Sequence, residues 1–280
     1  MTWFGPRLKI QIGVVLVVGM CLVAIFAHVL APHDPYAQNL MQRLKPPVWE
    51  ARGTWAHPLG TDNFGRDLLS RLIYGSRLSI VVGLLAMVVA LSFGTMLGLI
   101  AGYLGGRVEQ VIMRFADAYQ AIPEILLAIV VVAVFGGGVT VLILVLGFAG
   151  WESYTRVAFN LTRSLRERAF VEAAVASGAG GRYVMWRHIL PQMSPVLTVI
   201  ATLQVGQLIL QETALSFLGL GLPPPTATWG NILAEGRDRL LVAPWIANLA
   251  GMAIVLLVLG VNLLGNGLRE TLDPRRVDRR

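Results

Sequence analysis

The stretch LSIVVGLLAMVVALSFGTMLGLI, residues 78–100, contains no charged side chain. It is longer than the ~20 mostly apolar residues that an α-helix needs to cross a bilayer. The whole chain shares this character, because 55% of its 280 residues are hydrophobic and only 14% are charged. A soluble domain averages about 25% charged residues. The sequence therefore predicts an all-α integral membrane protein.

Five more apolar runs, read outward from this stretch, bring the expected number of transmembrane helices to six. The run from Ile122 to Gly150 would form a helix of about 43 Å, which is longer than the ~30 Å hydrocarbon core. We divide it at Gly136–Gly138, since glycines permit a tight turn. The six expected spans are residues 10–30, 78–100, 119–135, 139–154, 195–218 and 245–264.

Between the spans, polar residues and prolines predict shorter segments. Residues 67–77 are expected to form a short interfacial helix, and residues 102–120 a polar connector. Pro191 is expected to end a short helix before the fifth span, because proline interrupts helix hydrogen bonding. In the second span, small residues four apart indicate close helix packing in lipid; they are Gly94, Gly98 and Gly102.

Positive charges predict the orientation of the six spans. With the N-terminus in the cytoplasm, fifteen of the 23 Lys and Arg residues fall on the cytoplasmic side. Eight fall outside, and six of those lie in the long first loop. Cytoplasmic loops carry an excess of Lys and Arg. We therefore expect both termini in the cytoplasm, with the arginines of residues 269–280 at the anionic leaflet.

The sequence disfavours both nucleic-acid binding, which the net charge of +7 suggests, and ATP hydrolysis by this chain. The basic residues fall between apolar runs instead of forming one face, which argues against nucleic-acid binding. A P-loop needs Gly-Lys-Ser/Thr to cradle phosphates. The two lysines are followed by other residues, Lys9 by Ile10 and Lys45 by Pro46. This chain is therefore not expected to hydrolyse ATP.

Cysteine and histidine content argues against a disulfide or a metal site. Cys21 is the single cysteine, so no intrachain disulfide can form. None of the four histidines is paired at a metal-ligand spacing such as i, i+4; they are His28, His33, His57 and His188. We expect no metal and no cofactor bound by this chain.

The segment RSLRERAFVEAAVASGAGGRYVMWRHILP, residues 163–191, is helical in character but too charged to cross a bilayer. Its alanines favour helix and would let another protein surface approach closely. Glu172 offers a carboxylate for a charge-assisted hydrogen bond, and Gly178 permits a sharp turn. From these residues alone, a coupling segment and a solvated connector remain equally good interpretations.

A family resemblance decides between them. EAAVASGAG followed by ILP resembles the EAA loop of binding-protein-dependent ABC importer permeases of the type I (MetI-like) fold. The wider pattern resembles the C-type subunit of the dipeptide, oligopeptide and nickel permeases. The stretches that carry it are HPLGTDNFGRDLLSRLIYGSR (57–77), MRFADAYQAIPEILLAI (113–129), LRERAFVEAA (165–174), ETALSFLGLGLPPPTATWGNIL (212–233) and LRETLDPR (268–275).

The resemblance implies a permease subunit that forms half of a translocation pathway in the bacterial inner membrane. Its expected partners are a homologous permease, two ATPases that use ATP and Mg²⁺, an extracytoplasmic binding protein and membrane lipid. Small peptides are the expected substrates; nickel and glutathione-like peptides are alternatives. The implied division is residues 1–56 and 57–75 for the anchor helix and outer loop, 76–268 for the permease domain and 269–280 for a cytoplasmic tail.

The same resemblance implies three groups of site residues. An ATPase would dock on the EAA loop, through Glu172, Ala173, Ala174, Gly178, Arg182, His188 and Pro191. The binding protein would meet the outer face, for which Asp62, Arg66, Asp67 and Trp229 are candidates; capping of the outer helix ends is the alternative. Glu212 and Ser216 lie late in the fifth span and would line the passage or hold the interface between the two permeases.

Three other classes of protein are weighed against a permease subunit. A secondary transporter usually places ionisable residues in several spans, and we count only Glu212 as deep. An intramembrane enzyme needs paired carboxylates, a histidine cluster or an activated nucleophile. A purely structural membrane protein would leave the EAA loop unexplained.

Overall fold

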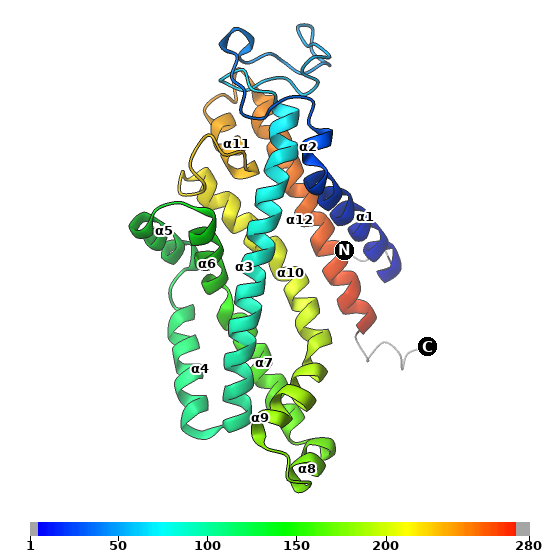
Figure 1. The fold of residues 1–280 in the computed structure, drawn as a ribbon, viewed down its shortest axis with the longest axis vertical. Helices are drawn as coiled ribbons and strands as arrows, with labels where there is room; N and C mark the ends of the chain where they lie inside the picture. The colour runs from blue at the N-terminus through cyan, green and yellow to red at the C-terminus, as the bar shows by residue number, and fades with distance from the viewer. Residues whose placement is uncertain (1–4, 273–280) are drawn as a thin grey trace.

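The computed structural model describes residues 5–272 (Figure 1). Within this range the secondary structure is helical, apart from one isolated bridge between Thr61 and Asp67. Residues 273–280, with four of the five arginines assigned to the cytoplasmic tail, lie outside the described range. The helices are α1 Pro6–Ile25, α2 Ala27–Leu30, α3 Leu68–Leu104, α4 Gly106–Gln120, α5 Glu124–Phe135, α6 Val139–Ala149, α7 Trp151–Arg166, α8 Ala169–Ala176, α9 Gly181–Val184, α10 Leu190–Phe217, α11 Trp229–Arg237 and α12 Pro244–Leu272, with a 3₁₀ turn at Leu40–Gln42 and a π turn at Met185–Ile189.

Six segments of this structure can cross a membrane. Four are single helical runs that are long and apolar enough, at Pro6–Ile25, Leu68–Leu104, Gly181–Phe217 and Pro244–Thr271. The other two are bent pairs, α4 with α5 at 86° and α6 with α7 at 42°. The prediction of an all-helical chain with six spans is confirmed when each bent pair counts as one span.

Helix α3 corrects the boundary expected for the second span. The predicted interfacial helix at 67–77 and the span at 78–100 form one helix of 37 residues, about 56 Å long at 1.5 Å per residue. No proline interrupts it, and the Asp67 side chain caps its first turn by accepting a hydrogen bond from Ser70 N. The predicted connector at 102–120 is also wrong, because α4 begins directly after Gly105, which has φ +68°.

The third and fourth spans are broken where the sequence predicted continuous helices. The chain leaves helix at 121–123, because the residue before Pro123 is disfavoured in the α region, and α5 then turns by 86° from α4. Gly150 separates α6 from α7. The predicted turn at Gly136–Gly138 is confirmed, since α5 ends at Phe135 and α6 begins at Val139.

Pro191 does not end a helix before the fifth span, contrary to the prediction. Helical structure runs from Gly181 to Phe217 through the π turn. There Leu190 N bonds to Met185 O, five residues back. The wider turn provides room for a proline ring, which would clash with the carbonyl four residues earlier in a regular α-helix.

Close packing of α3 against α7 confirms the interpretation of the three spaced glycines. A Cβ added at Gly94, Gly98 or Gly102 would come closer than 3.0 Å to atoms of α7. Thr155 Oγ1 donates a hydrogen bond to Gly94 O at 3.1 Å. Without side chains on α3 at these positions, the two backbones can approach as closely as they do.

The two ends of the molecule differ (Figure 1). One end, here called the cap, consists of the loop 31–67 and α11. The other carries α8 and α9. Helix α1 runs toward the cap and α12 runs away from it, and the start of α1 lies beside the end of α12, where Lys9 pairs with Glu270.

Candidate functional site

Helix α8 at the end opposite the cap is the first candidate site. It follows α7 after a short turn and is attached to the bundle through Val171, which is buried with residues of α3, α7 and α10. Val184 and Ile189 are buried in the same cluster. Helix α8 itself packs against α7 and α9, so a displacement of α8 would reach α3 and α10 through this shared buried cluster.

A glycine turn defines the end of α8. Gly178 has φ +87°, its N–H bonds to Val175 O at 2.9 Å, and Ala179 N bonds to Ala174 O at 3.0 Å. This pair of bonds is a Schellman motif, in which the residue after the helix adopts the left-handed conformation. Gly178 therefore sets the direction in which the chain leaves α8 for α9.

Most of the residues predicted for ATPase docking are exposed. Glu172, Ala173, Gly178, Arg182 and Pro191 are exposed, while Ala174 and His188 are half-buried. Large apolar side chains are exposed around them, including Tyr183 and Trp186 at 57% each, with Phe170 and Val175. An exposed apolar surface with a carboxylate and a guanidinium at its edge is typical of a protein docking site. Docking itself stays a prediction.

A buried ion cluster in the cap is the second feature. Arg66 Nε donates to Asp62 Oδ2 at 2.6 Å and Arg66 Nη2 to Glu235 Oε2 at 2.8 Å. Arg71 donates to both carboxylates as well. The side chains of Asp62 and Arg71 are fully buried. The cluster thus ties the loop, the start of α3 and α11 into one unit.

The four residues predicted to face a binding protein have internal partners. Asp62 and Arg66 belong to the ion cluster, Asp67 caps α3, and Trp229 Nε1 donates to Leu72 O at 2.9 Å. All four side chains are buried, which favours the alternative that they cap the outer helix ends. Contact between the cap and a binding protein stays a prediction.

Sequence reasoning missed Arg71 and Glu235, the other two members of the ion cluster. Arg71 lies within the quoted stretch 57–77, but its i, i+4 spacing from Asp67 indicates the wrong partner, because Arg71 pairs with Asp62 and Glu235. Glu235 is 164 residues further along the chain, and no local signal joins it to Arg71. Only the fold brings these charges together.

Glu212 lies in the cap half of α10 and is fully buried in its own chain. Ser216 Oγ donates to Glu212 Oε1 at 2.8 Å, and Ser79 Oγ lies 3.5 Å from Oε2. Ser79 in turn accepts from Trp229 N at 3.4 Å. The structure thus brings Glu212, Ser216 and Trp229 together. That Glu212 and Ser216 line the passage or hold the interface between permeases stays a prediction.

Glu212 is not the single deep acid that the sequence indicated. Glu152, in the first turn of α7, is 4% exposed, and its Oε1 accepts from Ser153 Oγ at 2.8 Å. Glu124, in the first turn of α5, accepts from Gln211 Nε2 at 2.6 Å. Acids in three membrane segments weaken the argument from charge against a secondary transporter, so the distinction needs other evidence.

Comparison with known families provides that evidence. Residues 94–278 match the family described as "Binding-protein-dependent transport system inner membrane component". Residues 11–47 match the "N-terminal TM domain of oligopeptide transport permease C". The first match covers more than half of the chain and includes α8 and the turn after it.

Curated relatives span nearly the whole chain. A "Di/tripeptide transport system permease protein DppC" from Pseudomonas aeruginosa is 40% identical over 94% of this chain and 87% of its own length. A glutathione transport permease, GsiD from Pectobacterium atrosepticum, is 38% identical over 90% and 82%. A nickel transport permease, NikC from Escherichia coli, is 36% identical over 98% and 97%.

A solved structure supports the fold independently. A chain of the MetNI methionine ABC transporter superposes with a TM-score of 0.59 at 18% identity, covering 74% of this chain and 98% of that chain. The predicted MetI-like type I helical fold is therefore confirmed.

Proposed function

We propose, on the premise that the chain belongs to the family of binding-protein-dependent transport system inner membrane components, that it imports di- and tripeptides as one permease subunit of an ABC importer. The family makes it a multi-pass inner-membrane permease. The peptide substrate is supported by a relative 40% identical over 94% of the chain that is named for di- and tripeptide transport.

The observation that carries this function is the exposed surface of α8, to which we assign the docking of an ATPase. It lies at one end of the bundle and is attached to α3, α7 and α10 through buried residues. In the proposed mechanism an ATPase subunit binds this surface and moves these helices when it closes on ATP. This chain is non-catalytic and binds no nucleotide itself, while the partner ATPases hold ATP and Mg²⁺.

The complete importer proposed here contains this chain, a homologous permease, two ATPases and an extracytoplasmic binding protein. The α8 end faces the cytoplasm and the cap faces outward. The start of α1 and the end of α12 both lie away from the cap, so both termini are proposed to be cytoplasmic. This agrees with the excess of Lys and Arg predicted for that side.

Reconstituted uptake tests the function. Proteoliposomes that contain the full importer are expected to accumulate a labelled dipeptide only with ATP inside and binding protein outside, and to do so with the membrane potential collapsed. Ni²⁺ and glutathione serve as competitors in the same assay. Uptake without ATP would contradict an ABC importer, and uptake of Ni²⁺ or glutathione in place of the dipeptide would replace the substrate.

A charge reversal on α8 tests the docking surface. Glu172→Lys is expected to lower ATPase co-purification and peptide uptake at least about 10-fold, because the side chain is exposed and its partner would be cationic. Reversal of an acid in the first helical turn costs the fold only about 0.3–1 kcal/mol. Glu167→Lys, an exposed acid just before α8, is the matched control and should retain both activities. Equal losses in both variants would mean that no specific contact is made.

Glu212→Gln distinguishes a role in transport from a role in folding. Glutamine keeps the size of the side chain and can still hydrogen-bond to Ser216 and Ser79, so assembly is expected to be normal. Peptide uptake per assembled complex should fall about 10-fold if the charge meets the substrate when the helices move. Unchanged uptake would remove Glu212 from the passage.

A further inference from the structure

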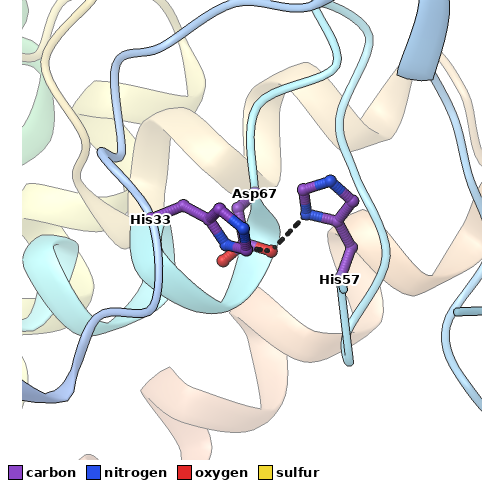
Figure 2. A group of neighbouring side chains, drawn as sticks. All are labelled: His33, His57 and Asp67. Carbon is purple, nitrogen blue, oxygen red and sulfur yellow. Dashed lines mark hydrogen bonds and ion pairs between the residues drawn. The ribbon is translucent and has the colours of Figure 1, made fainter. Parts of the chain in front are cut away.

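The fold joins two histidines and an aspartate that the sequence keeps apart. His33 follows α2, His57 lies in the middle of the cap loop, and Asp67 caps α3 (Figure 2). His57 Nδ1 lies 2.9 Å from Asp67 Oδ1, and His33 Nδ1 lies 3.8 Å from the same oxygen. The expectation that no metal ligands cluster in this chain therefore needs correction.

These three side chains come close to the geometry that a divalent metal ion requires. One ligand atom from each lies within 4.8 Å of the other two. A tetrahedral site with bonds of ~2.0–2.1 Å needs ligand atoms about 3.4 Å apart. The His33 side chain is 42% exposed, so its ring can turn toward an ion without disturbing the core, and the same exposure leaves an entry path.

Buried neighbours hold the ligands in place. Asp67 Oδ2 accepts from Ser70 N at 2.8 Å and from Ser70 Oγ at 2.7 Å, which leaves Oδ1 to face both imidazoles. Ser70 Oγ also accepts from His33 N at 3.0 Å. The Asp67 side chain is only 1% exposed. Such outer partners orient ligands in metal sites; here Ser70 orients the Asp67 carboxylate and holds the backbone of His33 beside it.

We propose that His33, His57 and Asp67 form a binding site for one divalent transition-metal ion of the zinc type. Two imidazole nitrogens and one carboxylate oxygen suit Zn²⁺, Cu²⁺ or Ni²⁺ and disfavour Ca²⁺ or Mg²⁺, which prefer oxygen ligands. With three protein ligands, a water molecule completes a tetrahedral site. The bound ion links the end of the first span, the cap loop and the start of α3.

Zinc binding by the full chain tests this site directly. The chain is purified in nanodiscs through a tag without histidines, and Zn²⁺ binding is measured by calorimetry. Wild type is expected to bind one ion per chain. His33→Ala and His57→Ala are each expected to weaken binding at least about 100-fold, the upper range seen when even an outer partner of a ligand is lost.

The matched control is His28→Ala, since His28 is an exposed histidine on α2 outside the cluster. It should bind Zn²⁺ as wild type does. Co²⁺ provides a second readout, because its visible spectrum distinguishes a tetrahedral protein site from a hydrated ion. The proposal would be overturned if wild type bound no stoichiometric Zn²⁺, or if the His33→Ala and His57→Ala variants bound it as tightly as wild type.

A protection assay tests the structural consequence. Zn²⁺ is expected to slow proteolysis of residues 31–67 in wild type but not in His33→Ala, whose exposed side chain can be removed without a core defect. Mg²⁺ at the same concentration should protect neither protein. Equal protection of both by Zn²⁺ would locate any metal effect elsewhere.

Discussion

Replacing Gly178 with proline is expected to abolish substrate-stimulated ATP turnover while leaving the chain inserted in the membrane. Gly178 has φ +87° and its N–H bonds to Val175 O. Proline holds φ near −65° and has no N–H. The turn after α8 cannot form with it, and a helix of eight residues is too short to persist without its flanking contacts. The measurement is ATPase activity of the reconstituted importer with loaded binding protein.

Two alanine variants separate the effect of backbone conformation from the effect of adding a side chain. An alanine Cβ at Gly178 or Gly180 would meet no atom within 4 Å. The two positions differ in φ, which is +87° at Gly178 and −67° at Gly180. Gly178→Ala should reduce coupling, since the left-handed conformation costs an L-residue about 1–2 kcal/mol, and Gly180→Ala should not. Full stimulation in Gly178→Pro would show that the turn plays no part in coupling.

Arg71→Met is expected to destabilise the cap strongly. Arg71 is fully buried and donates to both Asp62 and Glu235. Removal of one partner from a buried ionic cluster costs about 3–5 kcal/mol, and here it leaves the Asp62 and Glu235 carboxylates to share the single guanidinium of Arg66. The variant should unfold at a lower temperature and yield less assembled importer. Tryptophan fluorescence reports the transition, since Trp229 and Trp245 lie in and beside the cap.

The matched control for this prediction is Arg77→Met. Arg77 lies on the same helix but is exposed, and its guanidinium lies 6.0 Å from the centroid of the Tyr74 ring. Exposed pairs contribute about 0–1 kcal/mol. If Arg71→Met melts at the same temperature as Arg77→Met, the buried cluster contributes no more than the surface pair.

Features set by short stretches of residues were predictable from the sequence. The apolar runs predicted the number of spans, and the Gly136–Gly138 turn and the glycine packing face of α3 were correctly interpreted. The motif around Glu172 gave the helix and the turn at Gly178 before any geometry was known. These predictions depend on local composition, which is visible in one stretch of chain.

Features that depend on distant residues were not predictable. The ion cluster joins Arg66 to Glu235, 169 residues apart, and the histidine pair joins positions 24 residues apart in an irregular loop. The full length of α3 was also missed, because its polar first turns indicate an interface in isolation. In the structure Arg71 in these turns is paired with Asp62 and Glu235 from elsewhere in the chain.

The uninterrupted length of α3 has a mechanical consequence for alternating access. One rigid rod reaches from the ion cluster of the cap to the buried residues beneath α8, whereas the bent helix pairs beside it contain joints. When such a rod tilts about its middle, its two ends swing in opposite directions. A tilt of α3 that opens the passage on one face of the bilayer would therefore close it on the other face, so that no continuous pore forms.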